Sequence, residues 1–191
     1  MQWRYAAGLA VITMLAAGCA TTPTAAGSAA LREGRAAEAA SNFEQALAQE
    51  PERLDALIGL GISRFRLGNY DDAIASLSQA VSRAPAHAAA RLYLALAHLR
   101  RHQDAPALEQ LTALRGLDLE PRFGALVDQA LELLRAGTPS DPVRTYMIAS
   151  LDYGADWSRE LAETRRALRS AQLYADSLWW SPSYYYVIRH R

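Results

Sequence analysis

The sequence repeats itself with a spacing of 34 residues, and this period constrains the fold more than any other feature of the chain. Residues of one kind recur in three successive segments: Arg32, Arg66 and Arg100; Ala39, Ala73 and Ala107; Phe43, Leu77 and Leu111. A period of about 20 to 50 residues is typical of repeat proteins, in which each unit buries its apolar face against the next unit. The chain is therefore expected to be a repeat protein.

The middle copy, residues 54–87, indicates the shape of one unit. Gly61 and Ala73 are small enough to let two helices approach closely. Gly68 permits a left-handed turn between those helices. Pro85 stops the second helix, because proline has no amide proton to donate. These residue types are the ones that two closely packed helices joined by a tight turn would need.

Nine residues of this copy stand at signature positions of the tetratricopeptide repeat, which the sequence resembles: Leu57, Leu60, Gly61, Gly68, Tyr70, Ala73, Leu77, Ala80 and Pro85. The resemblance covers roughly residues 20–121 and implies an all-α solenoid of helical hairpins, with about three repeats over residues 29–121. The first repeat departs from the family because its early positions fall in an expected tether. The third departs around His102–Pro106, with Pro106 expected in the turn or in the first turn of a helix.

Further helices are expected over residues 122–178, where the period is lost. Gly137 and Pro139 close the first of them, and a second is expected to run from Asp141-Pro142 to Gly154. Asp156 is expected to cap the last helix. Its apolar residues alternate by four and three, which gives one stripe: Trp157, Leu161, Thr164, Leu168, Ala171, Ala175 and Leu178. Residues 179–191 form an aromatic tail.

The N-terminus is predicted to be a targeting signal rather than part of the fold. Residues 1–18 have a short positive start and an apolar run that is too short to span a bilayer. The run ends in Leu15-Ala16-Ala17-Gly18-Cys19, which resembles the lipobox of bacterial lipoproteins and implies lipidation of Cys19. The alternative is an ordinary secretory signal. Residues 19–28 are expected to form a lipidated tether, and Ala20, in place of aspartate, implies the outer membrane, facing the periplasm.

The resemblance also implies which side chains line a concave groove that binds protein. In the middle repeat they are Asp55, Ile58, Ile62, Phe65 and Arg66, and in the third they are Leu92, Leu96, Leu99 and Arg100. An apolar groove favours a helix or a hydrophobic segment of a partner. Phe65 is expected to be partly exposed there. For the three leucines an equal alternative is that they are core, covered by the helices after Pro121.

The residues offer little support for catalysis. His98 and His102 share a helix face, but Arg100 and Arg101 lie between them, and two cations disfavour a bound metal ion. No GxSxG, Walker or GxGxxG pattern is present. Twenty basic and twenty acidic residues balance, so no net charge favours nucleic acid. We expect no enzyme activity, no cofactor, no metal and no small-molecule substrate.

The predicted function is a non-catalytic periplasmic scaffold that is anchored to the outer membrane and serves an envelope machine such as a pilus or secretion system. The alternatives are an adaptor for peptidoglycan hydrolases or synthases, and a self-associating subunit. The aromatic tail either caps the solenoid or adds a strand to a partner. We expect Trp179 to pack internally, and the interacting tail residues to be Trp180, Tyr184, Tyr185 and Tyr186.

Overall fold

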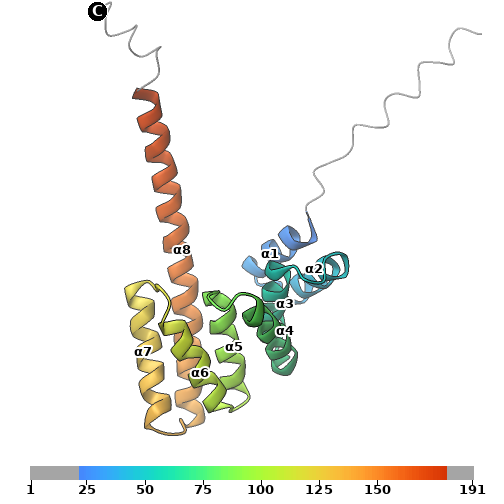
Figure 1. The fold of residues 1–191 in the computed structure, drawn as a ribbon, viewed down its shortest axis with the longest axis vertical. Coiled ribbons are helices and arrows are strands. Elements are labelled where there is room, and N and C mark those ends of the chain that lie inside the picture. Colours follow the sequence, from blue (N-terminus) through green and yellow to red (C-terminus); the bar gives the residue numbers. More distant parts are fainter. Residues whose placement is uncertain (1–21, 180–191) are drawn as a thin grey trace, which may run out of the picture. The chain divides into compact units, whose positions relative to one another are not determined.

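The computed structural model describes residues 22–179, and every regular element in that range is a helix (Figure 1). The elements are α1 (Pro23–Arg32), α2 (Ala36–Gln49), α3 (Leu54–Arg66), α4 (Tyr70–Arg83), α5 (Ala88–Arg100), α6 (Asp104–Arg115), α7 (Pro121–Ala136) and α8 (Asp141–Trp179). The prediction of an all-α fold built from helical hairpins is confirmed. The chain divides into two compact units, of which the first ends at Ala84 and the second begins at Pro85.

The first unit is built from two helical hairpins, α1–α2 and α3–α4. Helix α3 has a glycine at each of the two places where a neighbouring helix comes close: Gly59 faces α2, and Gly61 faces α4. A Cβ atom on Gly59 would lie 2.2 Å from Cζ of Phe43 in α2, and one on Gly61 would lie 2.5 Å from Cγ of Leu77 in α4. Both neighbours are fully buried, as is Ala73. The predicted close approach at Gly61 and Ala73 is confirmed, whereas the sequence reasoning missed Gly59.

The same turn closes three hairpins at the predicted spacing. The residues at positions 34, 68 and 102 all have positive φ, namely 77° for Gly34, 83° for Gly68 and 57° for His102. In each turn the next amide donates to a carbonyl five residues earlier: Arg35 to Ala30 at 2.8 Å, Asn69 to Arg64 at 2.9 Å and Gln103 to His98 at 2.9 Å. This is the Schellman arrangement. His102 therefore keeps the left-handed turn in the third repeat without glycine.

The N-terminal boundary of the fold differs from the prediction, because residues 23–28 belong to α1 and not to a tether. The Oγ1 of Thr22 accepts the amide of Ala25 at 3.3 Å, and Pro23 occupies the first helical position. Both features favour a helix start. Gly27 brings α1 against the ring of Phe43, which lies 3.0 Å from a Cβ placed there. The first repeat thus has a first helix after all.

The second unit packs α5 against α6 and then α7 and α8 against them, with α8 also contacting α5. Helix α8 is continuous over 39 residues. The predicted helix end at Gly154 and the predicted cap at Asp156 are therefore wrong. A Cβ on Gly154 would lie 2.5 Å from Cδ1 of Leu126. The glycine serves the close packing of α8 on α7 and does not stop the helix.

A buried ion pair ties α8 to α6 and was not predicted. Arg144 is almost fully buried, and its guanidinium donates to both carboxylate oxygens of Asp104 and, at 3.3 Å, to the carbonyl of Pro139. The hydrogen bond with Asp104 raises the pKa of Arg144 above its ordinary value, although burial opposes this. Arg144 shares a helix face with the buried Met147 and Leu151. The pair therefore stands at the edge of the apolar core.

Pro85 follows the end of α4 at Arg83, as predicted, and Pro106 lies in the first turn of α6.

The aromatic tail beyond Trp179 and the lipobox with Cys19 lie outside the described residues. Among residues 22–179, no helix is long and apolar enough to cross a membrane.

We predict that Gly61→Ala destabilises the first unit although alanine is the better helix former. The added methyl group meets the branch point of the buried Leu77, and overpacking of this kind costs about 2 kcal/mol after the gain in helix propensity. The control is Gly124→Ala in α7, where the nearest neighbour is an Arg115 side-chain atom 3.8 Å away, so stability should rise by about 1 kcal/mol. Chemical denaturation followed by circular dichroism measures both. A stabilised Gly61→Ala variant would contradict the packing described here.

The turn residues generate a second prediction, tested by a reciprocal exchange. Gly68→His should lower the free energy of unfolding by about 1 kcal/mol, because a Cβ is unfavourable at positive φ. His102→Gly should leave stability unchanged or raise it by up to about 1 kcal/mol, since glycine removes that strain but loses more chain entropy. Denaturant unfolding measures both effects. Equal destabilisation by the two exchanges would show that His102 stabilises its turn by contacts of its side chain.

Candidate functional site

Two of the five groove positions predicted on α3, Ile58 and Phe65, are core residues. Ile58 is buried, and Phe65 has only 7% of its surface exposed, so the expectation that Phe65 is partly exposed was wrong. Its ring lies 5.7 Å from the ring of Tyr70, which covers the turn after α3. Ile62 is half-buried, while Asp55 and Arg66 are exposed. Of the three apolar groove positions in this repeat, only Ile62 therefore keeps part of its surface exposed.

The positions predicted on α5 are core as well. Leu92, Leu96 and Leu99 have between 0% and 2% of their surface exposed. Helix α5 packs against α6 and α8, which agrees with the alternative that later helices cover these leucines. Arg100 is half-buried, and its Nε is buried without a hydrogen-bond partner among the described residues. The apolar side chains of α5 thus offer no open surface.

The position in α5 that corresponds to Gly59 is Tyr93, which is buried. Its hydroxyl donates to Oδ1 of Asp152 in α8 at 2.7 Å. A hydrogen bond to a charged acceptor is among the stronger ones in proteins. This hydrogen bond fixes α8 at Asp152, directly before Tyr153 and Gly154.

The two histidines take part in local polar contacts. His98 Nδ1 lies 2.7 Å from Oε1 of Gln103, and His102 Nδ1 lies 3.7 Å from Oδ1 of Asp141. Across residues 22–179, no group of three or more histidine, cysteine, aspartate or glutamate side chains is arranged to hold a metal ion.

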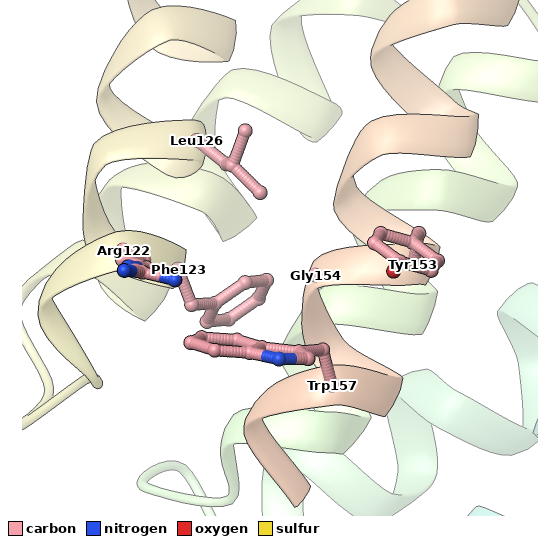
Figure 2. Close-up of a pocket in the computed structure, with 6 residues that line it drawn as sticks. All are labelled: Arg122, Phe123, Leu126, Tyr153, Gly154 and Trp157. Carbon is pink, nitrogen blue, oxygen red and sulfur yellow. The ribbon is translucent and has the colours of Figure 1, made fainter. Parts of the chain in front are cut away.

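An open hollow lies between α7 and α8 in the second unit, which we call the α7–α8 hollow (Figure 2). Its volume is about 320 Å³. Six residues line it: Arg122, Phe123, Leu126, Tyr153, Gly154 and Trp157. Apolar atoms make up most of the wall, and Arg122 supplies the one charged side chain among these six residues.

The start of α7 positions one wall of the hollow. The carboxylate of Glu120 accepts the amides of Arg122 at 2.9 Å and Phe123 at 3.2 Å, so it caps the helix. Pro121 follows at the first helical position. The cap sets the direction in which Phe123 leaves the helix, and Figure 2 shows its ring pointing toward α8.

Helix α8 supplies the other wall with residues one turn apart. The guanidinium carbon of Arg122 lies 5.2 Å from the centre of the Trp157 ring, which is a cation–π contact. Trp157 is half-buried, whereas Tyr153 has 74% of its surface exposed. Gly154 lies between them and leaves room for Leu126 and Phe123. Large aromatic faces beside one cation suit an apolar side chain of a protein partner that carries a nearby acidic group.

The sequence analysis did not predict this hollow. Trp157 was expected on an apolar helix stripe, but a helix end was expected at Gly154, which would separate Tyr153 from Trp157. The signal that was available is the spacing of Tyr153 and Trp157 by four, which puts both on one face of a continuous helix.

Two family models, each described as a tetratricopeptide repeat, match residues 30–78 and residues 58–118. Together the two matches cover residues 30–118, so this part of the chain is similar to tetratricopeptide repeats. A search of curated proteins found no match to the chain. Tetratricopeptide repeats are generally non-catalytic modules that bind other proteins, so the repeats support a role as an interaction scaffold. The α7–α8 hollow lies beyond the matched residues.

Proposed function

We propose that this protein is a non-catalytic scaffold that is held at the outer membrane by lipid on Cys19 and binds protein partners of an envelope machine such as a pilus or secretion system. The observation that carries the proposal is the run of tetratricopeptide repeats over residues 30–118. In the second unit the repeat hairpin α5–α6 packs with α7 and α8, and the binding surface is built on these helices.

The lipobox Leu15–Cys19 supports the anchor. Three acyl chains on one cysteine anchor firmly, because each buried CH₂ group contributes roughly 0.8 kcal/mol. The capping residue of α1, Thr22, is only three residue steps after Cys19, with Ala20 and Thr21 between them. Even fully extended, these steps span about 11 Å, so α1 begins close to the membrane surface. A scaffold in this position holds its partners beside the membrane.

We place the partner site at the α7–α8 hollow. The burial of Ile58, Phe65 and the three α5 leucines leaves the predicted groove with few apolar contacts to offer, whereas Tyr153 and Trp157 remain accessible. Tyrosine, tryptophan and arginine are the residues that contribute most to binding energy at protein interfaces. The apolar wall of the hollow suits an aliphatic side chain of the partner, and Arg122 suits an acidic neighbour of that side chain.

We predict that Tyr153→Ala and Trp157→Ala each weaken partner capture strongly. Loss of a central aromatic residue costs about 2 kcal/mol or more, which corresponds to roughly 30-fold weaker binding. The control is Tyr146→Ala, which removes an exposed tyrosine from the same helix outside the hollow. The readout is the amount of each partner recovered after crosslinking in envelope extracts, compared among the variants and the wild type.

Tyr153 is largely exposed, so its removal should leave the circular dichroism spectrum and the melting temperature unchanged. Equal recovery of every partner from the wild type and both hollow variants would overturn the assignment of the hollow. It would leave the scaffold function intact, with the partner bound elsewhere.

The anchor generates a separate prediction. Cys19→Ser should move the protein from the membrane fraction to the soluble periplasmic fraction, or leave it as unprocessed precursor, because serine accepts no diacylglyceryl group. Cell fractionation and the mass of the mature N-terminus measure this. Identical fractionation of the variant and the wild type would show that the chain is not a lipoprotein.

A further inference from the structure

The second half of α8 extends beyond the start of α7 (Figure 1). Every residue from Ala162 to Tyr174 is exposed. An isolated helix of this length is marginal in water, because most helical stability in proteins comes from packing of an apolar face. Packing against a partner surface would therefore stabilise this long exposed helix.

The exposed segment carries one apolar stripe, which we call the α8 stripe: Leu161, Thr164, Leu168 and Ala171. The sequence continues the same spacing to Ala175 and Leu178. The steps alternate by three and four, which is the heptad pattern of helices that wind around each other. Leu161 and Leu168 occupy the a positions, and Thr164 and Ala171 occupy the d positions. The stripe begins one step after Trp157, which packs under Arg122 of α7.

The charges beside the stripe are complementary to a second copy of the same helix. Glu160 stands at a g position and Arg165 at the e position five residues later. In a parallel pair of helices, each g residue faces the following e residue of the other helix, and opposite charges there set partner choice. Glu160 would face Arg165 of the second copy, and the symmetry of the pair would make this contact twice.

An antiparallel pair lacks this match. It sets g positions against g positions and e positions against e positions. The g residues along the described helix are Glu160, Ala167 and Tyr174, and the e residues are Ser158, Arg165 and Gln172. Neither set contains both an acid and a base. The remaining charged residues of the segment, Arg159, Glu163, Arg166 and Arg169, fall at b, c and f positions, where they face water in either arrangement.

We propose that the protein forms a homodimer in which the α8 stripes of two copies associate as a short parallel coiled coil. Thr164 and the alanines contribute less to the interface than leucines would, so the dimer is reversible and depends on concentration. The two copies present their α7–α8 hollows next to the base of the paired helices. A partner with two binding segments gains affinity from such a pair without any new contact.

Cysteine crosslinking of the full chain in detergent tests the proposal directly. In a Cys19→Ser background the introduced thiol is the only one, since Cys19 is the one cysteine of the chain. Leu168→Cys places a thiol at an a position, which in a parallel pair lies opposite its own copy at a distance that a disulfide can span. Mild oxidation should therefore convert most of this variant to a covalent dimer.

The matched control is Leu173→Cys, which stands at an f position on the opposite side of the helix. Leu173 and Leu168 are alike in type and exposure, with 65% and 66% of their surface exposed. Leu173→Cys should give at least tenfold less crosslinked dimer. Equal yields from the two positions, or none from Leu168→Cys, would overturn the proposal.

A charge exchange tests whether a second copy, rather than another occupant, covers the stripe. Glu160→Arg alone and Arg165→Glu alone should each weaken the dimer in analytical ultracentrifugation, because like charges then face each other. The double variant should restore the wild-type dissociation constant, since the pair is only reversed. Failure of the double variant to recover, or a monomer at all concentrations, would contradict a parallel dimer.

The tail after Pro182 is the other candidate to cover the stripe. If removal of residues 183–191 were needed before any dimer formed, the tail rather than a second copy would occupy the stripe in the full chain, and the proposal would be wrong. Dimerisation of the intact chain, unchanged by this deletion, is the expected result. The test uses no envelope partner, so its outcome is independent of the proposed scaffold function.

Discussion

The first unit depends on the absence of side chains at two places on α3. Gly59 and Gly61 lie on the sides where α2 and α4 approach, and the space that a methyl group would fill is occupied by Phe43 and Leu77. Overlap of this size cannot be relieved by a rotamer change of a fully buried neighbour. Both hairpins of the unit are joined through α3, so the spacing of α2, α3 and α4 follows from these two glycines, while Gly27 allows the approach of α1 to Phe43.

The second unit uses the corresponding positions differently, and this explains where its open surface lies. At the position of Gly59 it has Tyr93, whose hydroxyl binds Asp152 of α8. Arg144 and Asp104 join α8 to α6 in the same unit. Helix α8 is thereby fixed along its first half, the α5 leucines are covered, and the exposed aromatic residues gather between α7 and α8. The repeat pattern builds the frame, while departures from the pattern create the candidate site.

The period and the resemblance to tetratricopeptide repeats were enough to predict the hairpins, and Gly68 and Gly61 stand where the left-handed turn and the close approach occur. His102 shows that the turn persists without glycine when the surrounding hydrogen bonds are kept. The helix start at Thr22-Pro23 carried a recognisable cap, yet the segment resembled a tether in composition. Gly154 could not be interpreted from the sequence alone, since glycine both ends helices and permits close packing. Only the position of Leu126 decides between these roles.

The central claim is that partners bind at the hollow built by the later helices and not along α3. Site-specific photo-crosslinking in living cells measures this most directly, with a photoreactive amino acid placed at Tyr153 in the hollow and, separately, at Asp55 on α3. Both side chains are exposed, so either position tolerates the probe. We expect discrete crosslinked adducts with a partner from position 153 and none from position 55. Adducts from position 55 alone would place the binding surface on the repeats and contradict the account.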